Sequence, residues 1–94
     1  MKKHIQIRIA PKYKDIFLKN RNKIPQLIDK IISENIPIQR IDDFDIYSER
    51  ITITIDELHF EKLLELQKKY KMKTGTLIRN IVLNLISEQE NEVT

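Results

Sequence analysis

The sequence predicts an α+β fold, mostly α, in which two β-α-α repeats share a single domain covering residues 1–94. Two stretches, 4–9 and 50–55, alternate polar residues with isoleucine, which is the pattern of a strand with one buried face. They lie 46 residues apart, and two stretches with the apolar spacing of helices follow each of them. Because the same order of elements occurs twice, we expect two copies of one folding unit.

The first repeat covers residues 3–35. After its strand, Pro11 suits the first position of a helix. The apolar positions of this helix are Tyr13, Ile16 and Phe17. A break is expected at residues 20–24, and Pro25 suits the start of a second helix. The apolar positions of that second helix are Leu27, Ile28, Ile31 and Ile32.

The second repeat covers residues 50–88. Asp56 is a good N-cap, and Glu57 suits the first turn of a helix. The apolar positions of this helix are Phe60, Leu63, Leu66 and Tyr70, and those of the next are Leu77, Ile78, Ile81, Val82 and Leu85. A break is expected at residues 71–74. The last helices of the repeats align at an offset of 50 rather than 46, so the first helix of the first repeat is predicted to be about one turn shorter.

Residues 36–49 form the predicted linker between the repeats, and residues 89–94 form a polar tail. The linker contains Pro37 and the acidic residues Asp42, Asp43 and Asp45. Its apolar residues are Ile38, Ile41, Phe44, Ile46 and Tyr47. Exposing them would be costly, so the linker either folds back over the core or offers a surface to a protein partner. The sequence leaves both alternatives open.

A unit of about 40 residues buries too little apolar surface to be stable alone. A lone strand also leaves its backbone donors and acceptors unpaired. Both problems are solved if the two strands pair into an antiparallel ribbon. The isoleucines then face four helices on one side: Ile5, Ile7, Ile9, Ile51, Ile53 and Ile55.

In this respect the chain resembles the ribbon-helix-helix family of Arc-, MetJ- and CopG-type repressors. The segment Ile-Thr-Ile-Thr-Ile-Asp at 51–56 is similar to the family's reading strand and helix cap, and the second repeat is the better match. Most members are homodimers, whereas this chain resembles the single-chain form, an intramolecular pseudodimer. The family often has glycine between the two helices. Here Arg21 and Lys71 occupy that region, and Asn20 or Asn22 would best suit a left-handed turn in the first repeat.

The resemblance implies double-stranded DNA as the partner, read by the outer face of the ribbon in the major groove. The outward residues are His4, Gln6, Arg8, Arg50, Thr52 and Thr54. Arginine can bind guanine through two hydrogen bonds, glutamine can pair with adenine, and threonine offers a hydroxyl and a methyl group. The two strands carry different residues, so the expected DNA site has unequal halves.

Phosphate contacts are expected at the start of each second helix, where free N–H groups and the helix dipole favour an anion. The N-terminal arm should add further contacts to the DNA backbone. The residues expected to make them are Lys2, Lys3, Lys23, Lys73, Thr74, Gly75 and Thr76. Residues 1–35 carry nine basic and three acidic side chains, a balance that favours a polyanionic partner.

Other classes of function are disfavoured. The chain has no cysteine, no glycine-rich phosphate loop and no clustered metal ligands, so neither an enzyme, a cofactor nor a metal site is expected. His4 is placed on the outer face and His59 on the first turn of a surface helix, neither with a spaced partner. No apolar stretch approaches the roughly 18 residues of a membrane span, and no signal peptide is visible, which favours the cytoplasm.

Within DNA binding, a transcriptional repressor is the first expectation. By resemblance, such small proteins are typical of plasmids, phages and archaeal viruses. An accessory protein of the relaxosome or of partition, and an antitoxin-like protein-interaction module, stay open as alternatives. RNA is a poorer target, because its major groove is too narrow for a ribbon. The sequence does not distinguish a monomer from a swapped dimer or from self-association on adjacent sites.

Overall fold

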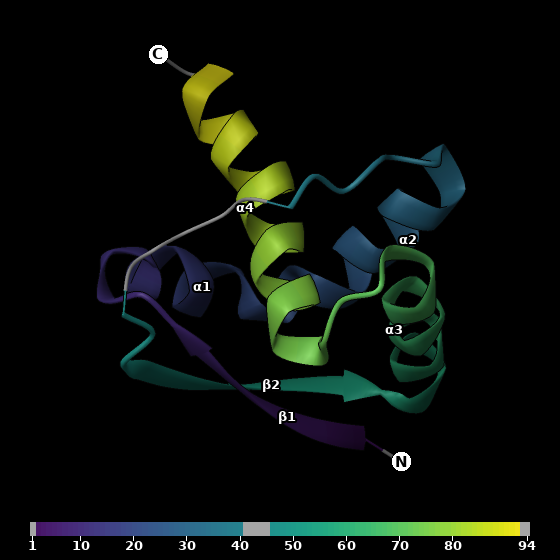
Figure 1. The fold of residues 1–94 in the computed structure, drawn as a ribbon, viewed down its shortest axis with the longest axis horizontal. Helices are drawn as coiled ribbons and strands as arrows, with labels where there is room; N and C mark the ends of the chain where they lie inside the picture. Colours follow the sequence, from purple (N-terminus) through teal and green to yellow (C-terminus); the bar gives the residue numbers. More distant parts are fainter. Residues whose placement is uncertain (1, 41–45, 93–94) are drawn as a thin grey trace.

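The computed structural model describes residues 2–40 and 46–92, with side chains for 2–40 and 46–86. The fold is α+β and mostly helical, with a two-stranded antiparallel sheet (Figure 1). In chain order the elements are β1 (Lys2–Ile9), the 3-10 helix η1 (Pro11–Tyr13), α1 (Lys14–Asn20), the 3-10 helix η2 (Arg21–Lys23), α2 (Ile24–Glu34), β2 (Glu49–Asp56), α3 (Glu57–Tyr70) and α4 (Thr74–Glu92). The α+β, mostly helical class and the antiparallel pairing of the two strands are as expected from the sequence.

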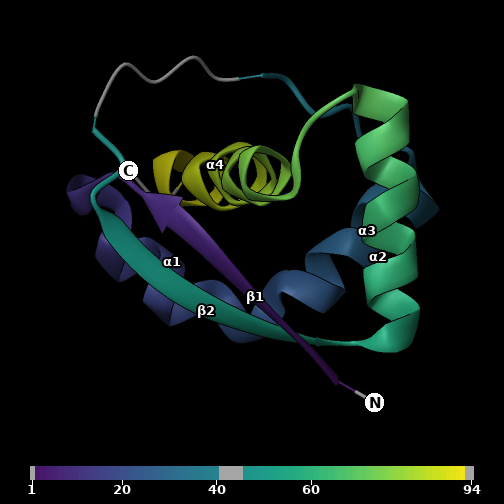
Figure 2. The ribbon, with the colours of Figure 1, turned by 60° about the horizontal axis from the view of Figure 1, so that its bottom comes forward.

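The two strands pair along their whole length, from Lys2 opposite Asp56 to Ile9 opposite Glu49. The predicted alternation is confirmed: the isoleucines are turned toward the helices and the polar residues between them are exposed. Ile5 is half-buried, and the other five ribbon isoleucines are at most 4% exposed. Figures 1 and 2 show both strands on one side of the molecule and the helices on the other.

Gln6 lies opposite Thr52 at the centre of the ribbon. These two residues are separated by 46 positions, the offset at which the strand sequences align. The two strands are therefore related by a local two-fold relation centred on this pair.

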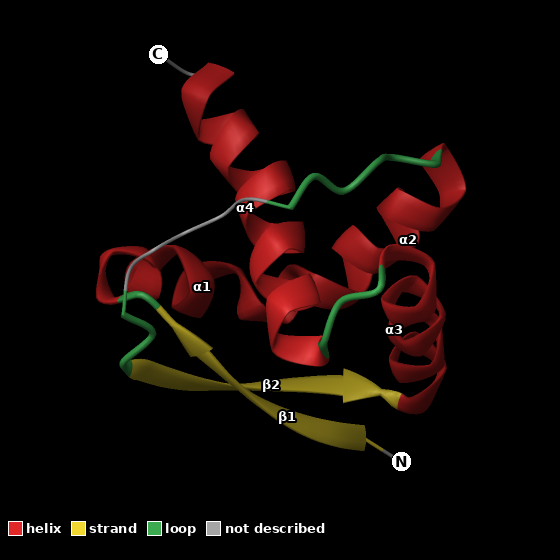
Figure 3. Ribbon diagram, viewed as in Figure 1, coloured by secondary structure: helices red, strands yellow, loops and turns green. Residues whose placement is uncertain are grey.

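Figure 3 shows a short loop between α3 and α4. This loop begins with a left-handed lysine. Lys71 has φ 56° and ψ 46°, and the following N–H, of Met72, donates a hydrogen bond to the Gln67 carbonyl at 3.2 Å. This is the usual way to end a helix, but glycine is the residue that adopts it without cost. The break expected at 71–74 is present, and α4 begins at Thr74.

The break after α1 is different. η2 runs straight into α2, and Asn20 has φ −113°. Neither Asn20 nor Asn22 is left-handed, so that expectation is wrong; among the described residues other than glycine, only Asn35 and Lys71 have positive φ. The Asn20 side chain instead donates a hydrogen bond at 2.8 Å to the carbonyl of Ile16, one turn earlier in the same helix.

The core lies between the ribbon and the helices and is formed mainly by isoleucine and leucine. Its most buried large side chains include Phe17, Ile24, Ile28, Ile53, Ile55, Leu63, Leu77, Ile78, Ile81 and Val82. Ile32 departs from the expected helical stripe, because it is 44% exposed while Val82, its counterpart at an offset of 50, is 1% exposed. The two halves of the core are therefore not equal.

The described part of the linker folds back over the core at its start. Ile38 is 6% exposed, and the backbone of Gln39 exchanges two hydrogen bonds with the Asn84 side chain on α4, at 3.1 and 2.8 Å. Ile46, at the other end, is 80% exposed. Ile41, Asp42, Asp43, Phe44 and Asp45 lie outside the described residues.

α4 continues to Glu92, beyond residue 88 where the second repeat was expected to end. Part of the expected polar tail is therefore helical. None of the helices in residues 2–40 and 46–92 has the length and apolar character needed to cross a membrane.

Candidate nucleic-acid interface

The outer face of the ribbon carries all six residues predicted to read DNA bases. His4, Gln6, Arg8, Arg50, Thr52 and Thr54 are exposed, and the helices leave this face uncovered. Only the half-buried Asp56 and Glu49 bring carboxylates to the ends of the described ribbon. The structure thus brings the predicted base-reading residues together on one surface.

These six residues form three cross-strand pairs. His4 lies opposite Thr54, Gln6 opposite Thr52 and Arg8 opposite Arg50. His4 Nδ1 and the Thr54 hydroxyl are hydrogen-bonded at 2.9 Å. The three pairs therefore differ in charge: one end of the outer face carries two guanidinium groups and the other carries none.

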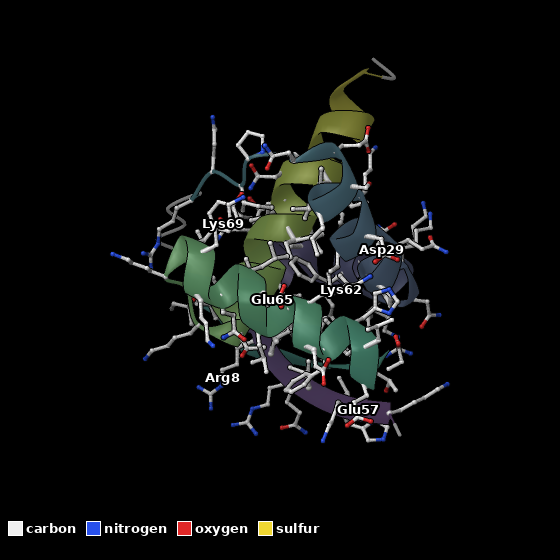
Figure 4. All side chains as sticks on the ribbon, turned by 90° about the vertical axis from the view of Figure 1, so that its right-hand side faces the viewer. Arg8, Asp29, Glu57, Lys62, Glu65 and Lys69 are labelled. Carbon is white, nitrogen blue, oxygen red and sulfur yellow. The ribbon has the colours of Figure 1, made fainter. Side chains whose placement is uncertain are left out.

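The Arg8–Arg50 pair places like charges directly opposite each other. Within the described part of the chain, neither guanidinium makes a hydrogen bond or an ion pair. Figure 4 shows Arg8 pointing away from the helices. A shallow hollow of about 230 Å³ opens beside this pair. Two cations side by side, without a counter-charge among the described residues, make this end of the ribbon attractive to an anion.

A larger groove of about 500 Å³ opens beside Arg8, at the start of α4. Its lining residues are Gln6, Ile7, Arg8, Tyr47, Lys73, Gly75, Thr76 and Arg79. By helix geometry the first backbone N–H groups of α4 lack partners inside the helix, since the Leu77 N–H makes the first such bond, to the Lys73 carbonyl at 2.8 Å. The groove thus combines cationic side chains with a helix start.

Gly75 faces Ile7 of β1 at this groove, at a distance that leaves room for a Cβ atom. A Cβ atom at Gly75 would meet Ile7 at 3.8 Å and the Arg79 guanidinium at 3.4 Å. Lys73 is exposed, while Thr74, Gly75 and Thr76 are half-buried. Three of the four residues expected at this helix start, Lys73, Gly75 and Thr76, therefore line the groove beside the ribbon, and Thr74 does not.

Sequence reasoning missed Arg79, one turn into α4. Its guanidinium donates to the Arg8 carbonyl at 2.9 Å and to the Thr76 hydroxyl at 3.2 Å. It also lies 4.2 Å from the centroid of the Tyr47 ring. These contacts hold Arg79 in the groove beside Arg8. The signal in the sequence was a single arginine between the apolar positions of α4, four residues after Gly75.

The start of α2 is not a second copy of this groove. η2 leads directly into α2, the Ile24 N–H donates to the Arg21 carbonyl, and Pro25 has no N–H to offer. Lys23 is exposed there. The start of α2 therefore offers fewer free N–H groups to a phosphate than the start of α4, and the expected contact of Lys23 stays a prediction.

Lys2 is exposed at the first position of β1, on the outer face of the ribbon. Lys3 alternates to the inner face, where it is half-buried with its ammonium 5.8 Å from the centroid of the Phe60 ring. The structure therefore separates these two lysines, and only Lys2 lies with the outward residues.

His59 has partners that the sequence did not reveal. Its Nε2 lies 2.9 Å from the Asp29 carboxylate on α2, and its Nδ1 lies 2.5 Å from Asp56. The Lys62 ammonium donates to Asp29 at 2.8 Å. Figure 4, viewed from the side of α3, shows these two side chains near each other. The bond to Asp29, helped by Asp56, raises the pKa of His59 above its ordinary value of 6.5, although burial opposes it. The bonds from His59 and Lys62 lower the pKa of Asp29.

Comparison of the chain with protein-family models, with curated proteins and with solved structures finds no match. The candidate interface therefore rests on the residues and geometry described above.

Proposed function

We propose that this chain is a single-chain ribbon-helix-helix protein that binds a specific sequence of double-stranded DNA and acts as a transcriptional repressor. In this proposal β1-α1-α2 and β2-α3-α4 are the two repeats, and the ribbon enters the major groove with its outer face toward the bases. The central pairing of Gln6 with Thr52, at the offset of the two repeats, supports this reading.

The observation that carries the proposal is the Arg8–Arg50 pair. Like charges directly opposite each other on a sheet are destabilising, by about 0.2–1 kcal/mol. The described residues supply no counter-charge, and both side chains are exposed. A surface that maintains this arrangement in the free protein is suited to a polyanion, which would relieve the repulsion on binding.

Two further features favour DNA over another polyanion. A two-stranded ribbon has the width to enter the major groove of B-form DNA. The outer face also carries glutamine, histidine and threonine, which can hydrogen-bond to base edges. The groove at the start of α4 would hold a backbone phosphate beside the ribbon through Lys73 and Arg79.

This activity calls for no cofactor and suits a protein of the cytoplasm, where its DNA target would lie. An accessory role in plasmid transfer or partition would use the same binding surface. For an antitoxin-like role, the start of the linker offers little, because Ile38 is buried and Gln39 is bonded to Asn84 of α4, whereas Ile46 at the other end is exposed.

The test is a fluorescence-anisotropy titration with a labelled duplex from the region upstream of the gene. Random duplex serves as competitor, at two salt concentrations. The variant Arg8→Ala/Arg50→Ala is compared with Lys30→Ala/Lys68→Ala, which removes the same charge from exposed positions on α2 and α3. We expect salt-sensitive binding by the wild type, a reduced sequence preference in the ribbon variant, and an unchanged preference in the control.

Absence of binding to any duplex at low salt would refute DNA binding. A ribbon variant that prefers the specific duplex as strongly as the wild type would refute base reading by the arginine pair.

A further inference from the structure

The pairing of the strands places both ribbon arginines at the same end. At the offset of 46, Arg8 is the counterpart of Thr54, and Arg50 is the counterpart of His4. The strands run antiparallel, so the residues that actually meet are Arg8 with Arg50 and His4 with Thr54. One half of the outer face therefore carries two arginines, and the other half carries a histidine and a threonine.

The second helices of the two halves, α4 and α2, also differ in charge, and the cationic side chain again lies at the arginine end of the ribbon. Arg79 of α4 is bonded to the Arg8 carbonyl and is thus fixed at the arginine end. Its counterpart on α2, at the offset of 50, is Asp29, which is occupied by His59 and Lys62. Cationic groups therefore gather at the arginine end from both the ribbon and α4.

The opposite end of the ribbon is closer to neutral. Lys2 lies opposite Asp56 there, so a carboxylate faces the ammonium across the ribbon. The Asp56 carboxylate is in turn held by His59. The His4–Thr54 hydrogen bond also orients two side chains toward each other, whereas neither guanidinium of the arginine pair has a partner among the described residues.

We propose that the chain binds a non-palindromic duplex in one fixed orientation, with Arg8 and Arg50 over a half-site containing guanine and His4 and Thr54 over the other half-site. This inference rests on the proposed function and specifies its DNA target. Arginine forms two hydrogen bonds to the O6 and N7 atoms of guanine, so two neighbouring arginines select for guanine in neighbouring base pairs. The backbone contacts of Arg79 and Lys73 reinforce the same orientation without reading sequence.

The first test is selection from a library of duplexes with a random core and fixed flanks. We expect an enriched motif with guanine concentrated in one half and an unrelated second half. The variant Arg8→Ala/Arg50→Ala should lose discrimination in the guanine half, by roughly 5- to 150-fold for each lost bidentate contact, and retain it in the other. The matched variant His4→Ala/Thr54→Ala should show the reverse.

The possible outcomes separate the two proposals. A palindromic motif, or one with guanine equally in both halves, leaves DNA recognition standing and refutes the fixed orientation. No enrichment over the starting library refutes sequence-specific binding itself. Circular dichroism of each variant checks that these exposed positions leave the fold intact.

The second test uses the absence of cysteine from the chain. A single cysteine is introduced by Lys2→Cys at one end of the ribbon, or by Glu49→Cys at the other, and labelled with an iron chelate that cleaves nearby DNA. We expect the first to cut only the flank beyond the half-site without guanine, and the second only the flank beyond the guanine half-site. Equal cutting on both flanks by either protein would show that both orientations are populated and would refute the inference.

Discussion

Asp29 on α2 accepts hydrogen bonds from His59 and Lys62 of α3, and its contact with His59 joins side chains 30 positions apart at 2.9 Å. This cluster connects the first half of the chain to the second. It also makes the stability of the fold depend on pH, because the hydrogen bond between His59 and Asp29 favours the charged forms of both groups.

The first prediction concerns that pH dependence. The raised pKa of His59 means that its contribution is fully present below about pH 6.5, the ordinary value, and is lost as pH rises through the raised pKa. The lowered pKa of Asp29 gives a contribution that is lost only in acid, below its ordinary value of 3.8. Urea unfolding between pH 5.5 and 8.5 should show the loss for the wild type. In His59→Gln it should be absent, and an unchanged slope in that variant would contradict the assignment.

The second prediction follows from the opposed arginines. Arg50→Thr should raise the free energy of unfolding by about 0.2–1 kcal/mol, since it removes like-charge repulsion and places a good strand former on the ribbon. The same change should weaken DNA binding. Arg50→Lys keeps the charge and serves as the control in both measurements. A loss of stability in Arg50→Thr would indicate that the guanidinium makes favourable contacts in the free protein.

The third prediction concerns the end of α3. Lys71→Gly should stabilise the protein by up to about 1 kcal/mol, because glycine adopts the left-handed conformation without the strain that lysine bears. Lys71→Ala should bring no such gain. Thermal unfolding of the two variants measures the difference. Equal melting temperatures would argue against a left-handed residue at this position.

The fourth prediction tests the linker. Ile38→Ala should destabilise the fold by about 2–4 kcal/mol, because it leaves a cavity where a buried side chain packs. Ile46→Ala, at an exposed position, should change stability by less than about 0.5 kcal/mol. Limited proteolysis should cut Ile38→Ala faster than the wild type near residue 38. Comparable stability of the two variants would mean that the start of the linker does not pack.

The fifth prediction separates anchoring from reading. Arg79→Gln should weaken binding to specific and random duplexes alike and reduce the salt dependence by about one counterion. Asp29→Asn, at the counterpart position on α2, should not weaken DNA binding. The two effects are read from anisotropy titrations over a range of salt. A change in sequence preference in Arg79→Gln would place its side chain at the bases instead.

Hydrophobic alternation was enough to predict the ribbon and its outer face. When isoleucine occupies every second position, only one face of the strand can be the buried one. A shift of one residue in the strand register would expose Ile53 and bury Thr52. The offsets also predicted that the first helix of the first repeat is shorter. At the offset of 46, the end of α3 at Tyr70 corresponds to Ile24, and η1 and α1 together end four residues earlier, at Asn20. For the two strands and the first helix, the pattern of apolar residues in the sequence matches the burial that the structure shows.

The remaining features depend on contacts between distant residues. Lys71 is left-handed although lysine has no preference for it, because the chain must turn there to bring α4 to the ribbon. The roles of Arg79 and His59 depend on partners, Arg8 and Asp29, that lie far away in the sequence. Helix periodicity carries no information about such partners.

The pairing of Gln6 with Thr52 has a consequence for how the protein responds to dilution. Because both strands of the ribbon belong to one polypeptide, forming it is a unimolecular step, and its equilibrium is independent of protein concentration. A ribbon shared by two chains would fall apart at low copy number, and its occupancy of any target would vary with the square of the concentration. Here the ribbon persists at any dilution, so under the proposed function the occupancy of a DNA target would follow the number of molecules in simple proportion until the target is saturated.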